Sequence, residues 1–285
     1  MFDATSPSEL RSGTLADGRA EIAFAADGGR TRLAHLYHHD PLRFLFPTSP
    51  AGDCIQAALV TTSGGLVGGD RLSINIKTLT RAMAMVSPQA AEKVYRSAGA
   101  DCEIDVTLTA ESASWLEWLP QETILFDNAR LHRVTKINAV HDARVFAGEM
   151  LVFGRIGRGE RLSRGYVRDA WEVRLDGKLV WADSLLLEDD IAATIAHPAG
   201  FDGATATATA VYVAADAAVQ LAAARAALGE DAEVRTAATV VNGVLVARFL
   251  GRDAKALRTA FGRFWATFRN NVAELPAVLP RLWHV

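Results

Sequence analysis

The sequence predicts a mainly β, α+β protein with a mostly antiparallel sheet and with helices in the C-terminal third. Three observations predict this class. Apolar and polar residues alternate in short segments through the first two-thirds of the chain, as in half-buried strands. Glycine-containing pairs separate several of these segments, and such pairs form tight hairpin turns. Between the segments there is no helix of the length that connects parallel strands.

The predicted strands follow one another through residues 1–200, which we expect to form a β-rich body. Residues 21–24 and 32–36 flank Asp27-Gly28-Gly29, a hairpin signal because glycine adopts the positive φ of a tight turn. A second hairpin is predicted around Asp176-Gly177. The other strands are predicted at residues 71–79, 103–109, 112–119, 130–140, 144–153, 171–175 and 179–187.

Residues 201–285 are predicted to form a strand–helix–strand–strand–helix unit. Its strands span residues 205–213, 233–241 and 244–250, and Asn242-Gly243 predicts a hairpin between the last two. Asp216 is expected to cap a helix over residues 217–228 that stops at Gly229, and Asp253 to open the last helix. That helix has an apolar face that is either core or a partner site, formed by Leu257, Phe261, Phe264, Trp265 and Phe268.

Composition indicates a soluble globular protein. The 285 residues include 30 Lys and Arg against 33 Asp and Glu, and the resulting net charge of −3 disfavours a general nucleic-acid binder. Cys54 and Cys102 are too few for a disulfide scaffold or a Cys-rich zinc site. The N-terminal residues lack the basic and apolar regions of a leader. We therefore expect a cytoplasmic protein with reduced thiols that does not contact a membrane.

A glycine-rich segment is the first conspicuous motif. Gly64, Gly65, Gly68 and Gly69 fall within six positions and are followed by Asp70. The segment lacks the Gly-Lys-Ser/Thr of a phosphate loop and the spacing of a dinucleotide-binding fingerprint. We interpret it as a structural turn between strands, in which Asp70 either caps the loop or lines a cavity.

Two further segments combine charge with aromatic residues. Pro88 is expected to open a short helix that carries Glu92 and Arg96, and a charged surface is the simplest interpretation of this helix. Trp115 and Trp118 predict either a strand buried on both faces or an interface.

Glu149 lies in an otherwise apolar predicted strand, residues 146–153. A carboxylate there must be solvated, paired or hydrogen-bonded, because burying it alone is costly. A structural ion pair and a water-filled cavity or metal path both remain open as explanations. Asp183 interrupts an apolar segment in the same way.

Residues 154–168 contain a glycine-spaced run of arginines: Arg155, Arg158, Arg161 and Arg164. We predict an exposed loop that either docks a protein partner or is only solvated. Elsewhere the histidines form no His-x-x-x-His pair, and no Gly-x-Ser-x-Gly elbow occurs. The residues therefore predict no catalytic group and no tight metal site.

Five motifs together resemble the UreD (UreH) family of urease accessory proteins. They are residues 64–70 (GGLVGGD), 95–99 (YRSAG), 116–122 (LEWLPQE), Gly154-Arg155 with Gly159-Glu160, and 279–283 (LPRLW). Their order and spacing cover nearly the whole chain, so we expect residues 1–285 to form a single UreD-like domain. The chain departs from the family pattern at residues 88–93, where many relatives have a shorter run, and before Gly18, where nothing matches.

The resemblance implies a maturation factor that is not an enzyme, built as an extended, mostly antiparallel β superstructure. UreD-like proteins join UreF and the GTPase UreG, and the assembly docks on apo-urease to help install its nickel. UreE is an indirect partner. Nickel is in transit through an internal water-filled passage, GTP acts only through UreG, and no cofactor is held tightly.

The resemblance also implies roles for individual residues. By residue match, Asp70, Glu149 and Asp183 correspond to acidic residues of the passage. From the residues rather than from this match, we assign partner docking to Arg155, Arg158, Arg161 and Arg164 of the loop and to Arg281 and Trp283 near the C-terminus.

Two other classes of function stay open on the residues alone. A β-rich hydrolase would use Asp70, Glu122 or Glu149 as general acid or base, but no local motif pairs a nucleophile with a base. A nucleic-acid or nucleotide binder would use the Arg155–Arg168 loop, against the net charge of −3.

Overall fold

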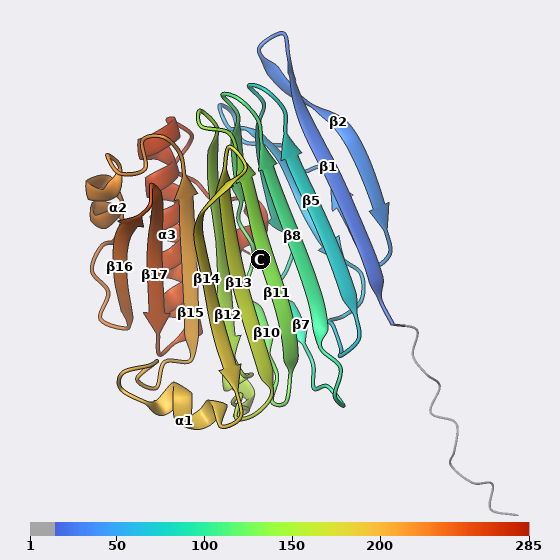
Figure 1. Cartoon of the computed structure of the whole chain (residues 1–285), viewed down its shortest axis with the longest axis vertical. Helices are drawn as coiled ribbons and strands as arrows, with labels where there is room; N and C mark the ends of the chain where they lie inside the picture. The colour runs from blue at the N-terminus through green and yellow to red at the C-terminus, as the bar shows by residue number, and fades with distance from the viewer. Residues whose placement is uncertain (1–14, 285) are drawn as a thin grey trace, which may run out of the picture.

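The computed structural model describes residues 15–284, which form two facing β sheets with helices at the C-terminal side (Figure 1). Within these residues the first sheet has seven strands, in the order β14 (Lys178–Glu188), β13 (Tyr166–Leu175), β11 (Arg130–Ala139), β8 (Cys102–Ala110), β5 (Arg71–Thr78), β1 (Asp17–Asp27) and β2 (Arg30–His39). The expectation about an N-terminal leader concerns residues outside this range.

The second sheet faces the first. Its main path is β16 (Val234–Val241), β17 (Val244–Gly251), β15 (Ala206–Val213), β12 (Arg144–Phe153), β9 (Trp115–Trp118), β6 (Met83–Pro88), β4 (Ile55–Thr61) and β3 (Leu42–Leu45). Two short strands, β7 (Glu92–Val94) and β10 (Thr123–Leu125), pair with each other, and β10 also pairs with β12. The helices are α1 (Ile191–Ala196), α2 (Leu221–Leu228) and α3 (Ala254–Ala273), with short 3₁₀ turns at Ile156–Arg158 and Arg281–His284.

The prediction of a mostly antiparallel sheet is wrong, because both sheets are mixed. The strands β1, β5, β8, β11 and β13 are parallel neighbours in the first sheet, and β4, β6, β9 and β12 are parallel neighbours in the second. The chain alternates between the sheets, so a strand of the facing sheet connects two parallel strands and no helix is needed. The result resembles a β-solenoid, in which the chain advances from the blue to the red side of Figure 1.

The three predicted hairpins are confirmed, and they supply antiparallel pairs at sheet edges. They join β1 to β2, β13 to β14 and β16 to β17. Asn242 and Gly243 have φ values of 49° and 83°, the left-handed conformation that a two-residue turn of this hand requires. The tail also has the predicted element order, β15–α2–β16–β17–α3.

Burial separates two hydrophobic layers. One lies between the two sheets, and the other lies between the second sheet and the helices α2 and α3. Strands β9 and β12 belong to both layers and are therefore buried on both faces. Trp118 packs in the first layer and Trp115 in the second, which confirms the doubly buried strand.

The apolar face of α3 is core, since its large side chains are all buried against the second sheet. Asp253 caps this helix as predicted, and its carboxylate accepts a hydrogen bond from Ala256 N at 2.7 Å. Helix α2 ends before Gly229 but begins only at Leu221, because Asp216 does not cap it. The Asp216 carboxylate instead accepts hydrogen bonds from the Tyr212 hydroxyl (2.9 Å) and Gln220 Nε2 (3.0 Å).

The helix expected after Pro88 is absent: within the described chain, β6 ends at Pro88 and Glu92 opens β7. Main-chain pairing with β10 decides this conformation, which the local spacing of charges did not indicate. Helix α1, which was not predicted, is capped by Asp190.

Candidate functional site

A buried arginine lies in the layer between the sheets. Arg133 on β11 and Asp169 on β13 are direct partners in the parallel register, and both side chains point inward with the alternation of their strands. The guanidinium binds Asp169 with two bonds, Nε–Oδ1 at 2.8 Å and Nη2–Oδ2 at 2.6 Å. Its Nη1 donates to Thr123 Oγ1 at 3.0 Å, so the arginine head is held on two sides.

Glu149 approaches the same guanidinium from β12 of the facing sheet. Its Oε2 accepts from Arg133 Nη2 at 3.2 Å, and its Oε1 accepts from Trp171 Nε1 at 2.6 Å. Burial raises the pKa of Glu149 well above its ordinary value, as does the Asp169 carboxylate, while Arg133 and the Trp171 hydrogen bond oppose the rise. The cluster therefore contains one guanidinium, from Arg133, and two carboxyl groups, from Glu149 and Asp169.

Glu149 lines two cavities. The first measures about 60 Å³, and its lining includes Thr61, Glu92, Gln121, Arg133 and Glu149. The second measures about 130 Å³, and its lining includes Glu149, Asp169, Trp171, Asp183 and Arg248. Each exceeds the roughly 10–15 Å³ that a single water requires.

Each cavity has an exposed residue in its lining, and the two residues lie on different segments. Exposed Ala90, in the connection between β6 and β7, lines the first cavity, and exposed Arg248 on β17 lines the second. Glu92 in the first cavity accepts a hydrogen bond from Thr61 Oγ1 at 3.0 Å, and burial raises the pKa of its carboxyl. Each cavity therefore has acidic residues in its lining, and Glu149 is common to both.

The structure brings two of the three implied passage residues together. Asp183 lines the second cavity with Glu149 and forms an ion pair with Arg248. Asp70 lines neither cavity: its two carboxylate oxygens accept hydrogen bonds from the main-chain nitrogens of Ala16 and Val67, both at 2.8 Å. Asp70 therefore anchors the glycine loop, one of the two roles considered for it.

The glycine loop is a structural turn in close contact with the Tyr95–Ser97 segment. The Tyr95 hydroxyl donates to the Gly64 carbonyl at 2.7 Å. A Cβ at Gly65, which has φ 141°, would meet the Tyr95 ring at 2.5 Å, and one at Gly68 would overlap Ser97 Oγ. The loop needs glycine here because neighbouring chain fills the space of a side chain.

The residues assigned to docking divide into exposed and buried ones. The exposed residues are Arg155, Arg158, Arg161, Arg164 and Arg281. Arg155 also pairs with Glu160 (Nε–Oε2 2.7 Å) and lies over the Phe126 ring. Trp283 is buried, with 5% of its surface exposed, and stacks on Phe261 of α3. In this fold Trp283 contributes to the core and is not presented to a partner.

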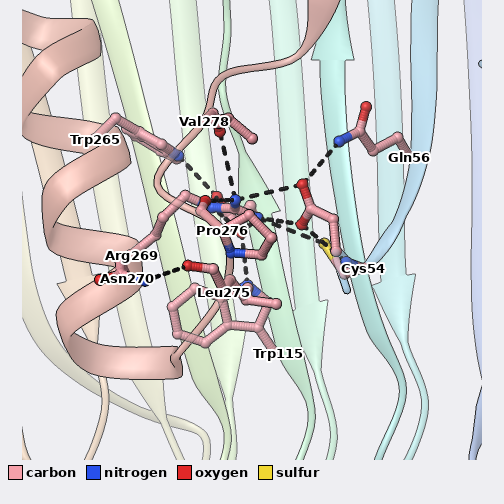
Figure 2. Close-up of polar contacts among 11 residues, drawn as sticks. Cys54, Gln56, Trp115, Trp265, Arg269, Asn270, Leu275, Pro276 and Val278 are labelled. Atoms are coloured by element: carbon pink, nitrogen blue, oxygen red, sulfur yellow. Dashed lines mark hydrogen bonds and ion pairs between the residues drawn. The ribbon is translucent and has the colours of Figure 1, made fainter. Parts of the chain in front are cut away.

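A second buried ion cluster, which the sequence did not reveal, joins α3 to the second sheet (Figure 2). Arg269 is fully buried and donates to Glu117 Oε1 (Nη2, 2.9 Å) and to Asp53 Oδ1 (Nη2, 2.5 Å). Glu117 also accepts from Trp115 Nε1 at 2.8 Å and from Trp265 Nε1 at 2.7 Å. The available signal was Arg269 itself, one turn after Trp265 on the apolar face of a helix, where a charge requires a partner.

The motifs of residues 116–122 and 279–283 are in contact beside α3. Gln121 Nε2 donates to the Leu282 carbonyl at 3.0 Å. Arg258 forms an ion pair with Glu122 and lies 4.7 Å from the centre of the Trp283 ring. Glu122 is thus engaged in an ion pair between α3 and the β9–β10 connection.

Several arrangements are absent from the described part of the chain. Among residues 15–284, no three His, Cys, Asp or Glu side chains lie close enough together to hold a metal ion. No helix over the same residues has the length and hydropathy to cross a membrane. Both thiols are buried, and burial raises the pKa of Cys54 and raises that of Cys102 to about 12.

Comparison with known families agrees with this architecture. The family model described as UreD urease accessory protein matches residues 16–284. The chain belongs to the UreD family. A relative from Magnetococcus marinus, named urease accessory protein UreD, is 44% identical over 99% of each chain. UreD proteins of Rhodopseudomonas palustris and Xanthobacter autotrophicus are each 41% identical, the first over 98% of this chain and 99% of its own, the second over 94% and 89%.

Membership of the UreD family makes the chain an accessory protein of urease and confirms the prediction that it is not an enzyme. The hydrolase alternative, which relied on Asp70, Glu122 or Glu149, is therefore wrong. Each of these carboxylates is engaged by main-chain nitrogens, an arginine or both an arginine and a tryptophan.

Proposed function

We propose that this UreD protein is a maturation scaffold that joins UreF and the GTPase UreG, docks on apo-urease in the cytoplasm and helps deliver nickel to it. Nickel is the cargo and has no resident site, GTP enters only through UreG, and UreE contributes indirectly. Within this chain the nickel route runs through the two cavities that share Glu149, past Asp183.

The position of Glu149 at the boundary of both cavities carries this proposal. A transit route must bind nickel(II) weakly, because nitrogen and sulfur ligands close together would trap it. Single carboxylates spaced along a water-filled route would meet this requirement, and Glu92, Glu149 and Asp183, which line the two cavities, support such a route. The exposed arginines Arg155 and Arg158, with their neighbours, are proposed to dock protein partners.

Glu149→Gln tests the route with the smallest change of shape. Glutamine keeps an acceptor for Trp171 but cannot release a proton and bind a passing cation as the glutamate carboxyl can. The variant is co-expressed with UreF, UreG and apo-urease, and two quantities are measured: recovery of the complex by affinity purification and nickel bound per urease. We expect an intact complex and nickel-poor urease.

Glu172→Gln is the matched control. Glu172 lies on β13 beside Trp171 of the cluster, but it is partly exposed and pairs with Arg174 at 3.2 Å. This control is expected to load urease normally. Normal nickel loading with Glu149→Gln in a recovered complex would remove Glu149 from the route and with it the proposed passage.

A further inference from the structure

At the residue that lines both cavities, two carboxyl groups converge on one nitrogen of a buried arginine. Glu149 Oε2 and Asp169 Oδ2 both contact the same nitrogen, Arg133 Nη2, at 3.2 Å and 2.6 Å. Both carboxylates line the second cavity, and Arg133 lines the first. Thr123 Oγ1 lies 3.0 Å from Nη1 of the same guanidinium.

Two carboxylates that converge on one point in a mostly buried space attract a divalent cation strongly. Carboxylate oxygens are good ligands for divalent metals, and the low local dielectric strengthens the attraction between a carboxylate and a cation. The guanidinium occupies the point of convergence and neutralises one of the two negative charges. Arginine suits this role because it stays charged when buried and its planar fork matches one carboxylate while its outer nitrogen reaches another.

We propose that Arg133 is the release element of the route, a positioning residue that prevents Glu149 and Asp169 from closing together on a divalent cation. The identification of nickel as that cation rests on the proposed function. With the arginine in place, a cation meets Glu149 singly and leaves again. Without it, the two carboxylates form a joint site that retains the cation.

The second ion cluster shows why the cavities matter. Arg269 also binds two carboxylates, Glu117 and Asp53, and the cluster likewise includes tryptophan indole donors. None of these three charged residues lines either cavity. The arginine with two carboxylates at Arg269 therefore connects a helix to a sheet, whereas the arginine with two carboxyl groups at Arg133 borders the two cavities.

The test measures Ni²⁺ binding to the purified full chain by equilibrium dialysis against NiCl₂, with no urease or partner present. Arg133→Met, which removes the charge at similar volume, is expected to bind one Ni²⁺ at least about tenfold more tightly than the unmodified chain. Adding Asp169→Asn to Arg133→Met should abolish the gain, since only one carboxylate remains. Arg133→Lys, which keeps the charge, should stay close to the unmodified chain.

Arg130→Gln is the control for loss of an arginine from the same strand. Arg130 pairs with a single carboxylate, Asp101, at 2.6 Å and is one-third exposed, so its loss should leave Ni²⁺ affinity unchanged. The proposal is overturned if Arg133→Met binds Ni²⁺ no more tightly than the unmodified chain, or if the double variant binds as tightly as Arg133→Met.

Folding of Arg133→Met is itself informative. The cation is predicted to replace the charge of the guanidinium, so a variant that folds poorly should be stabilised by Ni²⁺ in a thermal unfolding experiment. A variant that stays unfolded with Ni²⁺ also overturns the proposal. Because this experiment needs no urease, its outcome is separate from the nickel-loading test of the proposed function.

Discussion

Glu117 offers the clearest test of how α3 is attached to the second sheet. In Glu117→Gln the side chain keeps its size but loses its charge, and one of its two oxygens becomes a donor. That nitrogen would face the donors of Trp115, Trp265 or Arg269, which lie 2.7 to 3.0 Å from the carboxylate. Arg269, with no exposed surface, would keep Asp53 as its one acidic partner.

The expected loss of stability is large. Arg269 keeps Asp53, but the new amide nitrogen leaves buried indole or guanidinium donors without an acceptor, which costs about 1–3 kcal/mol for each donor and more for a charged one. A matched substitution, Glu122→Gln, breaks the ion pair with Arg258, and both of those side chains are about one-fifth exposed. Water and salt reach that pair in part, so its loss should cost less, on the order of 1 kcal/mol.

Urea denaturation followed by tryptophan fluorescence measures both costs. Trp115 and Trp265 donate directly to Glu117, so their emission also reports whether the cluster has rearranged. We expect the urea midpoint of Glu117→Gln to fall well below that of Glu122→Gln. If the two variants lose equal stability, the inference that the Arg269 cluster stabilises the contact of α3 with the second sheet more than the Arg258–Glu122 pair does is refuted.

Two other predictions follow from buried groups and close contacts. The folded chain holds the Glu149 proton more tightly than the unfolded chain, because the pKa of this carboxyl is raised on folding. The stability that results is fully present below the ordinary pKa of 4.5 and is lost as pH rises through the raised folded-state pKa. Unfolding free energies between about pH 5 and pH 9 should therefore fall more steeply for the unmodified chain than for Glu149→Gln, and parallel profiles would contradict the raised pKa. Gly68→Ala should cost about 1–3 kcal/mol, because its Cβ would overlap Ser97 Oγ and the Ala100 carbonyl, whereas Gly64→Ala has open space. Thermal unfolding of the two variants checks this, and equal melting temperatures would show that the loop adapts.

Local patterns were sufficient wherever the structure depends on neighbouring residues. Alternation located most of the long strands but missed β3, β4, β6, β7 and β10. Asn242-Gly243 located a hairpin, because two residues with positive φ decide the turn. Asp253 was recognisable as a helix cap for the same reason, since its partner Ala256 N is three residues away. The family resemblance was likewise visible in short motifs spread along the chain.

Sheet pairing was decided only by the tertiary structure. The alternation of a strand such as β11 shows that one face is buried but does not show which strand lies beside it or in which direction. Here the facing sheet supplies the connections, so neighbouring strands became parallel without helical crossovers. Pairing also determined the conformation of Glu92, which the spacing of charges assigned to a helix.

The sequence by itself determined that Glu149 needs a compensating environment, since a carboxylate in an apolar strand cannot be buried alone. The tertiary structure decided what supplies it: Arg133 and Trp171 from the opposite sheet, at the boundary of two cavities. Arg269 meets Glu117 across 152 positions of sequence by the same rule. Charge compensation acts through space, so the sequence specifies that a partner is required, and the arrangement of the sheets specifies which residue it is.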